Sequence, residues 1–195
     1  MYWRGLAYIL VFTICTNIIG LYLARTDPAL LERRMKVGPG AETRPAQKAI
    51  ISLAFLAFAA LFVVSALDYR FGWSKVPVSV SILGDILVAL GLAIDLRVFR
   101  ENSYGASTVE TAADQTVIST GAYALVRHPM YVGVLIMVLG VPLALGSYWD
   151  LVFMFVNVPI LMFRIRDEES MLRQELKGYL DYTRHVRYRL LPGLW

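Results

Sequence analysis

The sequence predicts an all-α integral membrane protein with five transmembrane helices and a C-terminal amphipathic helix at the cytoplasmic face. Hydrophobic residues make up 57 % of the 195 residues and charged residues 17 %. A soluble domain has about 45–50 % apolar and about 25 % charged residues. Apolar stretches that approach the roughly 20 residues needed to cross a bilayer recur along the chain. We expect residues 1–195 to form one domain.

The expected spans are apolar stretches with few charges. The third carries Asp85 in mid-span, and the fifth is short, with Asn157 and Pro159 inside it, so a kink is expected there. Pro129 suits the first position of the fourth helix. The turn from Gly146 to Trp149 predicts that spans four and five form a hairpin. The spans are placed at approximately residues 5–24, 49–67, 76–96, 129–147 and 149–165.

The distribution of Lys and Arg predicts the orientation of these spans. Sixteen of the 19 basic residues lie in the first connection, the third connection and the C-terminal tail, which five spans place on one side. The basic side of a membrane protein is usually cytoplasmic. We therefore expect the N-terminus outside, the C-terminus in the cytoplasm, and the compact chain in a bacterial inner membrane.

The segment after the fifth span has the spacing of an amphipathic helix. Glu168, Leu172, Leu176 and Tyr179 recur at helical intervals. Glu168 thus falls in line with an apolar stripe. A carboxylate on an inward-facing stripe is expected to meet a partner there.

The composition excludes several classes of partner and site. One cysteine, Cys15, allows no disulfide within the chain, and two histidines, His128 and His185, are too few for a His-rich metal centre. The basic residues sit beside apolar stretches, a pattern that suits anionic lipid head groups better than nucleic acid. We expect membrane lipids as partners, no nucleic acid and no metal. Arg33, Arg34 and Lys36 are interpreted as such a head-group patch.

Three motifs of the C-terminal half carry a resemblance to a known family. The first is Gly-x-Tyr-x-x-x-Arg-His-Pro-x-Tyr-x-Gly, from Gly121 to Gly133. The second is Glu168-Glu169 with Gly178-Tyr179 and Tyr182 after it, and the third runs from Arg189 to Pro192. With these motifs the chain resembles the isoprenylcysteine carboxyl methyltransferase family, which is broadly related to the phospholipid N-methyltransferases.

The resemblance implies that residues 100–195 bind S-adenosylmethionine at the cytoplasmic face. The N-terminus of span four can receive an anionic group, and a carboxylate after span five can accept hydrogen bonds from an ammonium or ribose. We favour Glu168 over Glu169, which has a surface partner in Arg173. The expected cofactor-binding residues are Tyr123, Arg127, His128, Pro129, Tyr131, Glu168 and Glu169. Arg127 has an alternative role, in which it extends to lipid head groups.

Methyl transfer from a sulfonium is a direct displacement that needs alignment and a dry site more than a protein nucleophile. The expected acceptor is lipophilic and enters from the bilayer, either a prenylcysteine-type carboxylate or another lipid. A carboxylate acceptor needs an arginine to orient it. Arg189 is the catalytic candidate by family position, with Arg100 behind it, and Asn102 and Tyr104 are placed at the acceptor site by position.

Two other functions stay open from the sequence. One is an NADPH-dependent membrane reductase, because some sterol reductases resemble this architecture at the C-terminal end. Such an enzyme needs basic side chains around a 2′-phosphate. The other is a non-catalytic lipid-binding membrane protein. Asp85 has no role in methyl transfer, and we expect it to hydrogen-bond Ser79, Ser81 or a neighbouring helix.

Overall fold

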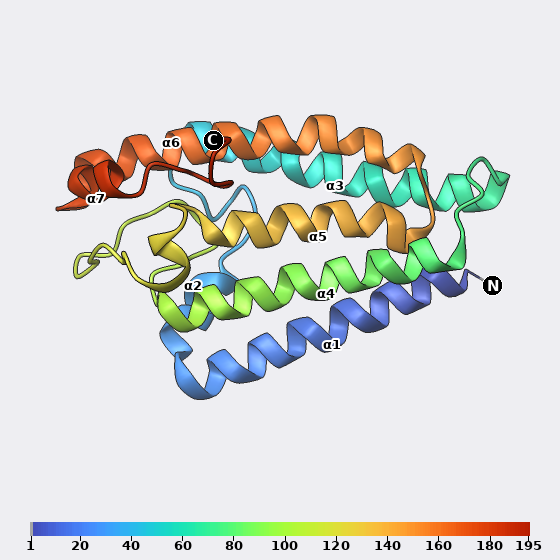
Figure 1. Ribbon diagram of the computed structural model, residues 1–195, viewed down its shortest axis with the longest axis horizontal. Coiled ribbons are helices and arrows are strands. Elements are labelled where there is room, and N and C mark those ends of the chain that lie inside the picture. The colour runs from blue at the N-terminus through green and yellow to red at the C-terminus, as the bar shows by residue number, and fades with distance from the viewer. Residues whose placement is uncertain (1) are drawn as a thin grey trace.

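The computed structural model describes residues 2–195, and these residues form helices and no β-strand. The long helices run side by side along the longest axis of the molecule (Figure 1). The elements are α1 (Trp3–Thr26), α2 (Pro28–Met35), α3 (Pro45–Phe71), α4 (Val78–Glu101), η1 (Gly121–Ala124), α5 (Pro129–Leu145), η2 (Trp149–Phe153), α6 (Met154–Glu175) and α7 (Tyr179–His185), where η marks a 3-10 helix. The expected all-α class is confirmed.

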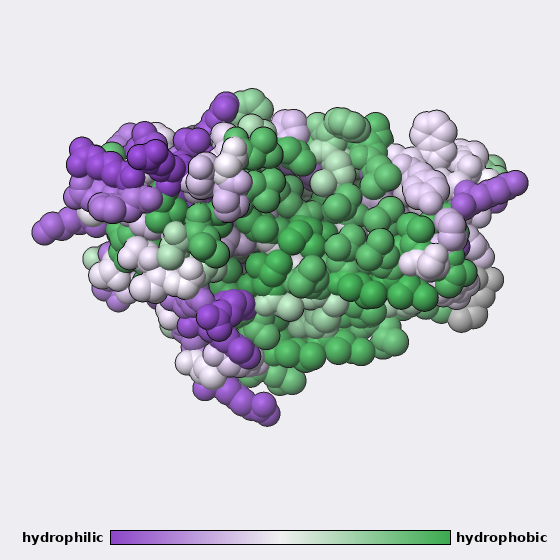
Figure 2. Space-filling view, in the orientation of Figure 1, coloured by the Kyte–Doolittle hydropathy of each residue, from purple (hydrophilic) through white to green (hydrophobic). Residues whose placement is uncertain are grey.

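Three helices, α1, α3 and α4, are long and apolar enough to cross a membrane. Large apolar side chains cover the outside of the bundle, for example Leu10 and Leu56, which are exposed to 61 % and 67 %. Figure 2 shows the resulting hydrophobic band between two polar ends. The larger polar end carries α2, α7 and the connection between α4 and α5 (left in Figure 1). We call it the site end. Helix α5 is apolar but has only 17 residues, and the count of five spans stays a prediction.

Helix α6 differs from the expectation of a span that ends at 165 and a separate amphipathic helix. It continues without a break from Met154 to Glu175, with Pro159 inside it. The apolar composition stops near Phe163, but backbone hydrogen bonding does not depend on side-chain polarity. The helix ends at Glu175, and Gly178, whose φ of 87° permits the turn, precedes α7.

Glycines allow α4 and α5 to pack closely. A Cβ on Gly91 would lie 2.5 Å from the carbonyl oxygen of Gly133, and one on Gly140 would lie 2.7 Å from the carbonyl oxygen of Gly84. Neither position has room for a side chain, so the two backbones touch as small residues permit in membrane helices. This close contact fixes α5, and with it the Arg127-His128-Pro129 segment, relative to α4.

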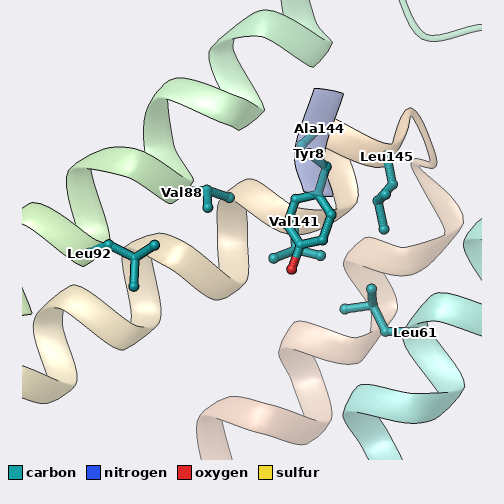
Figure 3. Close-up of a cluster of buried hydrophobic side chains, with 7 residues drawn as sticks. All are labelled: Tyr8, Leu61, Val88, Leu92, Val141, Ala144 and Leu145. Atoms are coloured by element: carbon teal, nitrogen blue, oxygen red, sulfur yellow. The ribbon is translucent and has the colours of Figure 1, made fainter. Parts of the chain in front are cut away.

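The main apolar core lies between α1, α3, α4 and α5 (Figure 3). Leu61, Val88 and Val141 are fully buried there, and Tyr8 of α1 packs against them. The core is on the side of the molecule away from the site end.

Asp85 lies beside this core without the expected contact. Its Oδ1 atom is buried and has no hydrogen-bond partner among residues 2–195. The expectation that Ser79 or Ser81 would satisfy this oxygen is therefore wrong. Ser79 lies six residues earlier, on another face of α4. Ser81 lies four residues earlier on the same face, but its Oγ is also buried and has no partner among residues 2–195.

Candidate active site

The C-terminal tail holds the Arg127-His128-Pro129 segment in place. The backbone N–H of Arg127 donates to the carbonyl of Tyr188, and that of His128 donates to the carbonyl of Arg189, both at 2.9 Å. Pro129 then opens α5, where its missing N–H leaves no donor unpaired. Pro129 is thus a structural residue at the edge of the site.

Glu169 is the centre of a buried charge cluster. Its carboxylate forms an ion pair with Arg127, whose Nε lies 2.9 Å from Oε1 without a hydrogen bond, and it accepts a hydrogen bond from Arg189 Nε at 3.0 Å. His128 Nε2 lies 3.3 Å from Oε1. The side chains of Arg127 and Glu169 are only 5 % and 3 % exposed. Burial alone would raise the pKa of the Glu169 carboxyl, but the hydrogen bond with His128 and the nearby positive charges hold it below its usual value.

Glu168 and Glu169 lie in different environments. Glu169, not Glu168, is the fully buried carboxylate, because the tail with Arg189 packs over the Glu169 side of α6. Glu168 has a side chain that is 21 % exposed and faces a cavity. It accepts a hydrogen bond from Tyr131 Oη at 2.7 Å. Glu168 is therefore available to a ligand, and Glu169 is not.

This polar cavity lies at the site end, between α6, α7 and the connection from α4 to α5. It contains about 800 Å³ of empty space, which includes space open to solvent. The predicted residues Asn102, Tyr104, Tyr123, Arg127, His128, Tyr131 and Glu168 all line it. The remaining lining includes the apolar side chains of Met171 and Leu172 on α6 and of Leu176 directly after it.

Two hydroxyl groups support the assignment of the polar cavity to a ligand with several polar groups. Thr108 Oγ1 and Tyr179 Oη are buried at this cavity and have no hydrogen-bond partner within residues 2–195. A buried hydroxyl without a partner costs about 1–3 kcal/mol. A ligand with several hydrogen-bonding groups can supply these partners.

Tyr123 is held at the cavity by the connection between α4 and α5, which contains the residues predicted for the acceptor site. Asn102 Nδ2 donates to Tyr123 Oη at 2.8 Å, and Asn102 Oδ1 accepts from the backbone N–H of Tyr104 at 2.8 Å. Tyr182 Oη donates to the carbonyl of Tyr123 at 2.7 Å. Burial raises the pKa of Tyr123 to about 12, although the bond from Asn102 lowers it. The phenol thus stays protonated at neutral pH.

Arg164 is a site residue that the sequence did not reveal. Its Nε donates to Tyr131 Oη at 3.0 Å, its Nη1 to Glu42 Oε1 at 2.9 Å and Gln47 Oε1 at 3.0 Å, and its Nη2 to the Ser107 carbonyl at 2.7 Å. Only its spacing from Glu168 was visible in the sequence. No pattern pointed to Glu42 and Gln47, which lie more than 100 residues earlier.

A second, apolar cavity lies between α3, α5 and α6, with about 830 Å³ of empty space, again including open space. Its walls are mainly aliphatic side chains, with Arg34, Ser107, Tyr131, Asn157 and Arg164 as the polar exceptions. The two cavities share Ala106, Met130 and Tyr131 in their walls. They therefore meet at the start of α5.

The two arginines expected to be catalytic line neither cavity. Arg100 is exposed at the end of α4 and lies over the ring of Tyr22, 4.8 Å from its centroid. It faces α1 because α4 presents its other side to α5. Arg189 binds Glu169 and lies 5.0 Å from the ring centroid of Trp195.

The fold and the cavities together define an all-α membrane protein with a polar cavity at the mouth of an apolar one. The chain belongs to the phospholipid methyltransferase family, whose model matches residues 80–177. That match runs from α4 to the end of α6. The resemblance to membrane methyltransferases that the motifs indicate is confirmed.

Two further similarities concern fold and partial sequence. The solved structure of the eukaryotic intramembrane Ras methyltransferase ICMT (isoprenylcysteine carboxyl methyltransferase) has a TM-score of 0.57 and 21 % identity, over 98 % of this chain and 75 % of that chain. At this identity the likeness shows the fold. The Delta(14)-sterol reductase TM7SF2 of Mus musculus is 31 % identical over 94 residues, 47 % of this chain and 22 % of that protein. The chain therefore spans about a fifth of the length of this curated relative.

Proposed function

We propose that the protein transfers a methyl group from S-adenosylmethionine to a lipophilic acceptor at the cytoplasmic face of a membrane, and that it crosses this membrane five times with its N-terminus outside. The observation that carries the proposal is the shared wall of the two cavities at Met130 and Tyr131. A polar cofactor on one side and an apolar acceptor on the other meet only there. Membership of a methyltransferase family supports the same reaction.

The cofactor belongs in the polar cavity. S-adenosylmethionine supplies, when bound, an electrophilic methyl group on a positively charged sulfur. Glu168 can accept from its ammonium or ribose hydroxyls, and Thr108 and Tyr179 can pair their free hydroxyls with it. Met171 and Leu172 give the same cavity an apolar wall, and a cofactor packed against them would shield the transfer from water, as a displacement at a sulfonium requires.

The protein's part in the transfer is alignment. Tyr131 lies in the shared wall, and its hydroxyl is fixed on both sides, by Glu168 as acceptor and Arg164 as donor. The acceptor enters from the bilayer through the apolar cavity and presents its head group at this wall. Arg189 is a positioning residue in this scheme, because it acts through Glu169 on Arg127 and His128. Such fixed positions supply the proximity on which a direct displacement depends.

The partial match to a sterol reductase keeps an NADPH-dependent reductase as the competing function. A 2′-phosphate needs free basic side chains near it. Among the residues described at the polar cavity, Arg127 is the only Arg or Lys, and Glu169 already pairs with it. The charge of this cavity thus favours the sulfonium cofactor.

Calorimetry with S-adenosylhomocysteine on the purified protein tests the proposal. Wild type should bind, and Glu168→Gln and Tyr131→Phe should each weaken binding by about tenfold, the value of one charged hydrogen bond. Asp181→Asn is the matched control, because this exposed carboxylate on α7 pairs only with Arg184 in solvent. It should bind as wild type does.

No binding by wild type contradicts the proposed function, as does stabilisation by NADPH but not by S-adenosylmethionine in a thermal-shift comparison. Unchanged binding by the double variant His128→Ala, Glu168→Ala contradicts the assignment of the site. A radiolabelled-methyl assay against total membrane lipids and small prenylcysteine analogues then identifies the acceptor. A protein that only binds lipids would transfer no label.

A further inference from the structure

Arg34 is not in the head-group patch where the sequence places it. Its guanidinium turns inward from the end of α2, lies 4.1 Å from the centroid of the Phe99 ring, and lines the apolar cavity. Its Nη1 donates to the carbonyl of Gly105 at 2.9 Å and lies 3.4 Å from Met130 Sδ. Met130 belongs to the wall that the two cavities share. Arg34 is therefore next to the place where donor and acceptor meet.

The charge of Arg34 has no direct counter-charge. Within residues 2–195 no carboxylate oxygen lies within 4.0 Å of its guanidinium, whereas Arg164 in the same cavity pairs with Glu42 at 2.9 Å. Asp95 attracts it from a greater distance, but burial dominates and lowers the pKa of Arg34. A charge that faces an apolar cavity without a counter-charge is costly. Of the two arginines there, Arg34 is the one available to a ligand.

We infer that Arg34 is a specificity-determining residue, and that it binds an anionic head group of an acceptor whose apolar chain fills the cavity between α3, α5 and α6. The inference rests on the proposed function. The cavity wall runs along α5 from Met130 to Val138, about 12 Å at the helical rise. An amphiphile with one charged end and an apolar chain of that length or more matches both the charge and the lining.

If the anionic head group itself is methylated, the position of Arg34 also affects turnover. A head-group oxygen forms the new bond to the methyl carbon, the carbon–sulfur bond of the sulfonium donor breaks, and its electron pair stays on sulfur. No proton moves, and the head group loses one negative charge. Arg34 then holds the acceptor more tightly than the methylated product, so the charge that selects the acceptor also promotes release.

Binding of matched amphiphiles to the full-length protein in detergent tests this role. The probes are dodecanoate, dodecyl phosphate and methyl dodecanoate, which share an apolar chain and differ in head-group charge. Variants Arg34→Gln and Arg34→Lys are compared with Lys36→Gln, which removes an exposed charge from the end of the same helix. Partition into micelles is the same for every variant, so it cancels when apparent Kd values of variant and wild type are divided.

Arg34→Gln should weaken binding of at least one anionic probe about tenfold or more, the value of a hydrogen bond to a charged group, and should leave methyl dodecanoate unchanged. Arg34→Lys should recover part of the loss, and Lys36→Gln should match wild type. The more strongly affected anion distinguishes a carboxylate from a phosphate head. Equal losses for the ester and the anions, or no loss for either anion, overturn the role of Arg34. Binding of S-adenosylhomocysteine is measured in parallel, so that a failure of the cofactor site is seen separately.

Discussion

The two ends of the helical bundle both bury carboxylates, but they satisfy them with different partners. At the site end, Glu169 pairs with the side chains of Arg127 and Arg189. At the opposite end, Asp68 accepts from Ser147 Oγ and from the backbone N–H and Oγ of Ser74, each at 2.6 Å, and Asp150 accepts from Ser65. Ion pairs between distant segments stabilise the site end, whereas hydrogen bonds from hydroxyl groups stabilise the opposite end.

This difference indicates different roles for the two ends. Glu169 joins α6 to the Arg127-His128 segment and to the C-terminal tail, so a change there should affect both stability and ligand binding. Asp68 joins the end of α3 to the α5–η2 turn, far from either cavity. A change at Asp68 should affect stability alone.

The largest effect is expected for Glu169→Gln. It leaves Arg127 buried without a carboxylate, which costs about 3–5 kcal/mol, and it releases the tail that carries Arg189. Unfolding in mixed detergent micelles measures the first effect, and faster tryptic cleavage around Arg184 to Arg189 measures the second. S-adenosylhomocysteine binding should fall by more than tenfold.

The control for Glu169 is Arg173→Gln. This arginine is 46 % exposed and lies 3.7 Å from Glu169, so its removal should cost at most about 1 kcal/mol. If Glu169→Gln shows the wild-type rate of tryptic cleavage in the tail and the wild-type affinity for S-adenosylhomocysteine, the charge cluster does not assemble the site.

At the opposite end, packing is the more sensitive property. Gly84→Ala would put a Cβ against the backbone of Ala144, so α4 and α5 must separate. We expect a loss of about 2–3 kcal/mol in thermal or denaturant unfolding, with ligand binding unchanged. Gly20→Ala is the matched control, because nothing lies within 4 Å of its added carbon. Equal stability of the two variants would contradict the close contact.

A smaller loss, about 1–2 kcal/mol, is expected for Asp68→Asn. The amide cannot accept from both Ser74 and Ser147 as the carboxylate does. The midpoint of unfolding reports this loss, and calorimetry with S-adenosylhomocysteine should give the wild-type affinity. Weaker binding would mean that the two ends are coupled, contrary to the comparison.

The smallest effect is a dependence on pH. The pKa of Glu169 is lowered in the folded protein from an ordinary value of 4.5, so its contribution is fully present above pH 4.5 and is lost as the pH falls through the folded-state pKa. The tail of wild type should therefore become sensitive to acid-stable proteases below about pH 4.5. The sensitivity of the tail to these proteases should vary less with pH in Glu169→Gln than in wild type. Identical profiles for the two proteins would rule out this carboxylate as the cause.

Hydropathy and the local motifs predicted much of the fold and part of the site. The apolar stretches identified α1, α3 and α4, and the spacing of Pro129 and Gly146 delimited α5, because these signals are local. The end of α6 was missed, since the helix continues beyond its apolar residues. The burial of Glu169 was missed as well, because it depends on where the tail packs.

The partners of the two cavity arginines show the limit most clearly. In the sequence, Arg34 is one of several basic residues in a connection, and Arg164 is a charged residue at the end of a predicted span. The packing of α2 against α4 places Arg34 at a cavity without a counter-charge. The packing of the segment that carries Glu42 against α6 gives Arg164 hydrogen-bond acceptors for its guanidinium.

The sequence by itself determined that the chain is a helical membrane protein and that the residues from Gly121 to Gly133 belong with Glu168-Glu169. Hydropathy and contiguous motifs are properties of neighbouring residues, so they can be read along the chain. The tertiary structure decided which carboxylate faces the polar cavity, which arginine has no counter-charge, and where the two cavities meet. Those properties depend on burial and on distances between segments far apart in the sequence, which exist only once the helices have packed.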